Sequence, residues 1–148
     1  MKSILDPLYI KIAKEKKYLP QLEEILKVNC CQIEPDFLGF TDTYRYLAKL
    51  IPHDWTIIDL GCANAIQSYY FMKHRRYIGV DSSDCLKFQT PNSIYFQENI
   101  KDFIINHKYL VKAPKTFAIV NYVPIQMHRK DMNLVKDTFD NLHIYYPE

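Results

Sequence analysis

Glycine and cysteine are both scarce in this chain. Only 3 of its 148 residues are glycine, and two of them, Gly61 and Gly79, lie within one stretch that runs from Trp55 to Asp81. The 4 cysteines form no C-x-x-C pair, and a structural zinc site needs such preorganised spacing. We therefore expect no metal centre, and we expect all four cysteines to be thiols. These are Cys30, Cys31, Cys62 and Cys85.

An excess of charge and long apolar runs are also missing. The 19 lysines and arginines nearly balance the 17 acidic residues, which leaves a net charge of +2, so charge alone does not indicate nucleic acid as a partner. The apolar runs are far too short to span a bilayer, and residues 1–17 lack the apolar core of a signal peptide. We expect no membrane association and a cytoplasmic location.

Length and composition indicate one folded domain. Apolar residues make up 48% of the 148 residues, which is enough to bury a sizeable core and argues against disorder. We predict a single domain over residues 1–148. It consists of an N-terminal helical segment (1–52) and an α/β core (53–148).

Strand and helix patterns alternate from Trp55 onward. Short apolar runs predict strands at 56–60, 77–80, 93–96, 116–120 and 142–146, and periodic patterns predict helices at 65–75, 100–107 and 130–140. Continuous apolar strands alternating with helices are typical of a parallel sheet covered on both faces. The prediction is an α/β fold, a Rossmann-like three-layer α/β/α sandwich. Its mostly parallel sheet has about five strands in the order 3-2-1-4-5, with N-terminal helices added.

Acidic residues end the first two predicted strands. Asp59 comes two residues before Gly61 in the first, and Asp81 ends the second about 20 residues later. A nucleoside needs a tight turn that the backbone can approach, a helix N-terminus behind it, and a carboxylate for the ribose hydroxyls. The sequence therefore predicts a nucleoside site where these strands end.

The same residues resemble class I S-adenosylmethionine (SAM)-dependent methyltransferases. The segment DLGCANA (59–65) looks like their motif I, an acidic and an apolar residue followed by G-x-G-x-G. The segment YIGVD (77–81) looks like their second motif, and ENIKDF (98–103) resembles the region that holds adenine. The match covers residues 55–146. It implies SAM as the cofactor and methyl transfer to an unidentified acceptor.

The resemblance implies a role for each matched position. Gly61 would let the backbone approach the methionine part of the cofactor, and Asp59 would orient the turn and the cofactor's amino group. Asp81 would accept both ribose hydroxyls through charge-assisted hydrogen bonds. Asn99 would meet the amino edge of adenine. Ser82 and Ile100 would flank the adenine ring. The implied cofactor-binding residues are Asp59, Gly61, Cys62, Ala63, Asp81, Ser82, Asn99 and Ile100.

Two positions depart from the family's pattern. Ala63 and Ala65 stand where motif I has its second and third glycines, and an added methyl disfavours a positive φ. Ala63 is tolerable if its φ is negative, and we expect Ala65 to begin the helix, where alanine is a good residue. The expected pocket is tighter than usual but usable.

The strand at 142–146 is expected to lie at an edge of the sheet. The family normally adds two further strands beyond this point, and an exposed edge is usually covered or paired. We expect the N-terminal helices to cover it, or a second copy of the chain to pair with it in a homodimer.

The end of the fourth predicted strand carries the candidate catalytic residues. It reads Asn121-Tyr122-Val123-Pro124, which partly resembles the Asn/Asp-Pro-Pro-aromatic motif of amino-methylating relatives. Asn121 and Tyr122 would position an acceptor lone pair in line with the sulfonium. His128 would act as a base if the acceptor must lose a proton.

Two other interpretations remain open. The alanines and the missing acceptor motif would suit an inactive methyltransferase-fold protein that works as a binding or interaction module. A nicotinamide-type Rossmann domain also fits Asp81, but Ile66 stands where its third glycine should allow helix–strand contact.

Overall fold

The computed structural model describes residues 7–28, 40–121 and 129–144. Its centre is a sheet of five parallel strands in the order β3-β2-β1-β4-β5, which confirms the predicted order. In this sheet Thr56 lies opposite both Arg76 and Thr116, so the central strand is in register with its two neighbours. The strands are β1 (Thr56–Leu60), β2 (Arg76–Val80), β3 (Ser93–Phe96), β4 (Thr116–Val120) and β5 (Leu142–Ile144).

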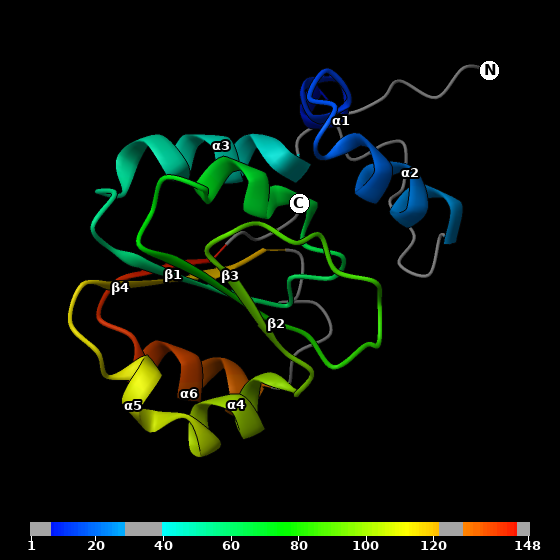
Figure 1. Cartoon of the computed structure of the whole chain (residues 1–148). Coiled ribbons are helices and arrows are strands. Elements are labelled where there is room, and N and C mark those ends of the chain that lie inside the picture. The colour runs from blue at the N-terminus through cyan, green and yellow to red at the C-terminus, as the bar shows by residue number, and fades with distance from the viewer. Residues whose placement is uncertain (1–6, 29–39, 122–128, 145–148) are drawn as a thin grey trace.

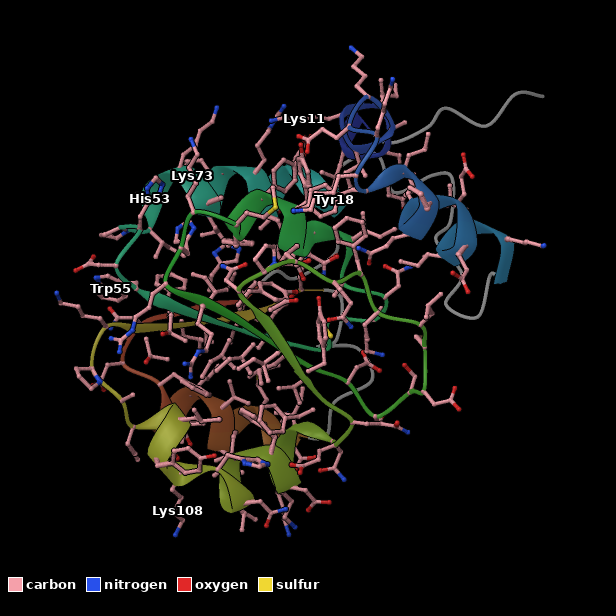
Figure 2. All side chains as sticks on the ribbon, viewed as in Figure 1. Lys11, Tyr18, His53, Trp55, Lys73 and Lys108 are labelled. Atoms are coloured by element: carbon pink, nitrogen blue, oxygen red, sulfur yellow. The ribbon has the colours of Figure 1, made fainter. Side chains whose placement is uncertain are left out.

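Helices cover both faces of the sheet, as Figure 1 shows. One face carries α3 (Phe40–Leu50) and the 3-10 helix η1 (Ile66–Phe71), with α1 (Pro7–Ala13) and α2 (Leu19–Val28) packed beyond η1. The other face carries α4 (Ile100–Asn106), α5 (Lys108–Val111) and α6 (Arg129–Thr138). In Figure 2, Lys11 and Tyr18 lie on the α3 side of the sheet and Lys108 lies on the α4 side. The three-layer sandwich is therefore confirmed.

The strands bury side chains on both faces because helices cover both. Successive residues of a strand point to opposite faces, so Ile57 of β1 packs with the α3 side while Ile58 and Leu60 pack with the α4 and α6 side. The helices meet them with one apolar stripe each. In α3 that stripe is Tyr44, Leu47 and Ala48, with Ile51 following the helix.

The segment predicted as a helix over 65–75 differs in the structure. It forms the shorter η1, and Ala65 precedes it as the N-cap with a left-handed backbone, φ 58°. Almost every residue of η1 is buried, and a short, tight 3-10 turn fits such a segment better than a longer amphipathic helix. The prediction that Ala65 begins an α-helix is therefore wrong.

The expectation of four thiols is wrong in part. Cys62 is a buried free thiol, whereas Cys85 is disulfide-bonded. Cys30 and Cys31 lie outside the described residues. In the parts of the chain that the structure describes, no group of three or more His, Cys, Asp or Glu side chains is placed to hold a metal ion.

The described helices are all too short or too polar to cross a membrane. β5 lies at one edge of the sheet, next to β4. Pairing of this edge with a second copy stays a prediction, as do the single domain over 1–148 and the cytoplasmic location.

Candidate functional site

The turn after β1 has an alternating left-handed backbone. Gly61, Ala63 and Ala65 have φ values of 83°, 51° and 58°, so the condition of a negative φ at Ala63 is not met. A left-handed conformation costs an L-residue roughly 1–2 kcal/mol. The turn therefore has the left-handed backbone that favours glycine at three alternate positions, although two of them are alanine.

Hydrogen bonds from the next strand and its loop hold this turn in place. The Gly61 and Cys62 N–H groups donate to the Val80 carbonyl at 2.7 and 3.0 Å. The Ala63 N–H donates to Asp81 Oδ2 at 2.8 Å, and the Phe88 N–H donates to the Asn64 carbonyl at 2.8 Å. Such contacts provide a physical reason why the alanines can keep their unfavourable φ.

Asp81 lies beside the turn, as the sequence predicts. Its Oδ1 accepts hydrogen bonds from the Ser83 N–H at 2.9 Å and the Ser83 hydroxyl at 2.6 Å. A carboxylate offers about four lone-pair sites, so three acceptances, including that from Ala63, leave one. Because the residue is partly exposed, this remaining site is available to a ligand. Ser82 is exposed on the same loop.

Asp59 is fully buried beneath the turn. Its Oδ1 accepts from the Tyr44 hydroxyl at 2.9 Å, and its Oδ2 accepts from the Gln67 amide at 2.9 Å and from the Tyr77 hydroxyl. Burial raises the pKa of Asp59 to about 6, and the three hydrogen bonds oppose that rise. The side chain thus supports the turn from below, where solvent does not reach it.

Three partners of Asp59 were not predicted as site residues. Burial and the Asp59 charge raise the pKa of Tyr44 and Tyr77 well above 10, so both stay protonated donors. Gln67 also donates to the Cys62 carbonyl at 2.9 Å, which ties η1 to the turn. The signal in the sequence was a polar pair, Gln67 and Ser68, within a segment whose other residues are apolar or aromatic.

Asn121 follows β4 and is buried. Its side chain donates a hydrogen bond to the Tyr44 phenol oxygen, which slightly opposes the rise in the pKa of Tyr44. Tyr44 therefore joins the acid of β1 to the amide after β4. Tyr122 and His128 lie outside the described residues.

Asn99 and Ile100 lie one strand further along, after β3. Asn99 is the N-cap of α4, with its Oδ1 accepting from the Asp102 N–H at 2.8 Å and its Nδ2 donating to Asp102 Oδ2 at 3.0 Å. Ile100 packs against the α4-side core. Asn99 is exposed, but capping already uses both of its amide groups.

The Cys62 side chain points inward from the turn and is 1% exposed. Burial, followed by the charges of Asp59 and Asp81, raises its pKa, so the sulfur remains a thiol. Its Sγ lies near the place where a side chain on Gly79 would project. Cys62 therefore contributes packing and a backbone carbonyl rather than a nucleophile.

Comparisons with known proteins support the fold. No family model matches the chain. A stretch of 70 residues, 47% of the chain, is 31% identical to the DNA replication helicase of Human herpesvirus 6A (strain Uganda-1102) and spans 8% of that protein. A proposed type II methyltransferase from Anaeromyxobacter dehalogenans superposes with a TM-score of 0.52 and 14% identity over 72% of this chain and 48% of that one. The chain thus covers less than half of each protein, and the structural likeness shows a Rossmann-like α/β fold.

Proposed function

We propose that this protein binds SAM at the carboxyl ends of β1 and β2 and transfers its methyl group to an acceptor. One observation carries the proposal. The partly exposed Asp81 carboxylate is hydrogen-bonded at 2.8 Å to Ala63, within a turn whose backbone has the left-handed shape of a glycine-rich loop. A carboxylate placed against such a turn is the arrangement that recognises a ribose next to a closely approaching ligand.

The residues present fit this cofactor. Asp81 keeps one acceptor site for a ribose hydroxyl, and Gly61, with a φ of 83°, has no side chain to obstruct a ligand that approaches the turn. Ser82 and Ile100 follow the adjoining strands β2 and β3, where the adenine would lie, whereas the Asn99 amide is already used by its cap. Asp59 holds the turn through Gln67.

When bound, SAM supplies an electrophilic methyl group on a sulfonium. In that transfer an acceptor lone pair would form the new bond to carbon, and the pair of the broken carbon–sulfur bond would stay on sulfur as a thioether. Positioning supplies much of the rate of such a transfer. Asn121 is the described residue at the strand end where the acceptor would lie, and Tyr44 fixes its amide. Tyr122 and His128 remain proposals for the same region.

Calorimetry with SAM and S-adenosylhomocysteine tests the proposal. We expect the folded protein to bind both, and Asp81→Asn to weaken binding at least tenfold, because a neutral amide loses the charge-assisted hydrogen bonds to the ribose. Asp84→Asn, an exposed change in the same loop, is the matched control and should leave affinity unchanged. Absence of binding of either ligand by the folded wild-type protein would reject the proposal.

One observation favours a second candidate, an inactive methyltransferase-fold protein that works as an interaction module. The Ala63 and Ala65 methyl groups add bulk to the turn at positive φ, and the Asp81 carboxylate already serves the protein's own backbone. Saturable transfer of a labelled methyl group from SAM to any acceptor would exclude this candidate.

A further inference from the structure

The loop from Ser82 to Asn92, between β2 and β3, folds back over the turn after β1. Phe88 is buried among α1, α2 and η1, and its N–H donates to the Asn64 carbonyl at 2.8 Å. These two contacts fix the position of the preceding residue, Lys87, beside the turn. Lys87 belongs to no motif of the sequence and is not among the implied cofactor-binding residues.

The Lys87 ammonium is a partly buried cation held by backbone carbonyls. It donates to the Cys85 carbonyl at 2.9 Å and to the Ser83 carbonyl at 3.4 Å. Within the ranges that the structure describes, Lys87 forms no ion pair. An ammonium has three donors, and the two carbonyls use two of them. Since a buried charge is normally paired, the third donor of Lys87 can bind an anion.

The surroundings of Lys87 are otherwise negative. The charges of Asp59 and Asp81 both act on Cys62 in the turn, and Lys87 is the cation that opposes them there. Ser83 links Asp81 to Lys87. Its N–H and hydroxyl donate to the Asp81 carboxylate, and its carbonyl accepts from the Lys87 ammonium. A ligand at this turn therefore meets an acceptor of hydroxyl groups and, a few residues away, a cation.

We infer that Lys87 binds the carboxylate of the cofactor's methionine part. This inference rests on the proposed function. SAM and S-adenosylhomocysteine carry ribose hydroxyls, which suit Asp81, and one carboxylate, which the two aspartates of the turn would repel without a nearby cation. Lys87 offsets that repulsion and thereby favours nucleosides that carry an amino-acid chain over nucleosides that lack it.

Ligand truncation tests this assignment. S-adenosylhomocysteine, its decarboxylated amine analogue and 5′-methylthioadenosine share one nucleoside, and the first alone carries the carboxylate. On wild-type protein we expect the loss of the carboxylate to cost about tenfold in affinity, the size of one charge-assisted contact. We expect Lys87→Met to weaken S-adenosylhomocysteine about tenfold while methylthioadenosine changes less than about twofold, and Lys87→Arg to keep most of the affinity.

The controls separate this inference from the proposed function. Lys101→Met, an exposed change on α4, should leave all three affinities unchanged. Equal weakening of all ligands by Lys87→Met would show that the lysine only braces its loop, and would overturn the inference while leaving the proposed function intact. Equal wild-type affinities for the acid and its decarboxylated analogue would overturn it even if the variant failed to fold. If wild type bound none of the three, both proposals would fall together.

Discussion

The buried Asp59 carboxylate should make the stability of this protein depend on pH in an unusual direction. Most acids in folded proteins titrate below their unfolded-state pKa and so stabilise the fold as pH rises. For Asp59, burial raises the pKa in the folded state from the ordinary 3.8 to about 6. Its contribution is then fully present below pH 3.8 and is lost as pH rises through about 6.

The size of this contribution follows from the two pKa values. The difference between 3.8 and about 6 corresponds to roughly 3 kcal/mol, at about 1.4 kcal/mol per pKa unit. Asp59→Asn removes the titration and keeps the shape. The free energy of unfolding of wild type, taken relative to Asp59→Asn, should therefore fall by roughly 2.5 kcal/mol between about pH 4 and about pH 7.

Urea unfolding followed by far-UV circular dichroism at several pH values measures this difference directly. Taking the difference between the two proteins cancels the other titrating groups, which are common to both. Asp137→Asn, exposed on α6, is the matched control and should differ from wild type by less than about 0.5 kcal/mol throughout. A difference between wild type and Asp59→Asn that stays constant over this pH range would refute the reasoning.

Two further predictions concern stability. Gly79→Ala would place a Cβ 2.6 Å from a Tyr95 ring carbon and 2.8 Å from Cys62 Sγ. The substitution should therefore lower the free energy of unfolding by about 3 kcal/mol. A loss below about 1 kcal/mol in urea unfolding would contradict this and mean that the Tyr95 ring moves freely. Asn99→Ala should cost about 1 kcal/mol through loss of the α4 cap to the Asp102 N–H. Asn99→Ser should retain most of the stability, because its hydroxyl can still accept from that N–H without placing a second carboxylate beside Asp102. Equal stabilities of the two variants in thermal unfolding would contradict the capping role.

The strand ends were predictable because they depend on local patterns. Apolar runs located each strand, and the parallel arrangement then placed Asp59, Gly61 and Asp81 at neighbouring strand ends. The contact between Asp81 and Ala63 follows from that placement. The residues nearest the candidate cofactor turn could therefore be named before the structure was known.

The residues that support the turn could not be predicted in the same way. Tyr44 reaches Asp59 from α3, 15 positions earlier in the chain, and an amphipathic stripe does not distinguish a tyrosine that packs from one that also donates a hydrogen bond. The positive φ of Ala65 contradicts the helix propensity of alanine because tertiary contacts hold it. The place of Asn99 after β3 predicts a contact with adenine, whereas in the structure its side chain caps α4.

The strand order also determines how long a loop must close before each neighbour of β1 can pair with it. From Thr56 of β1 the chain reaches its partner Arg76 of β2 after 20 residues and its partner Thr116 of β4 after 60, the differences of the residue numbers. Closing the threefold longer loop costs about 1 kcal/mol more in chain entropy. The pair β1–β2, with Asp59 and the following Asp81, is therefore the local half of the fold, and β4, which Asn121 follows, joins it across the longer connection. Insertions between β3 and β4 lengthen that connection at little closure cost and leave the turn after β1 unchanged.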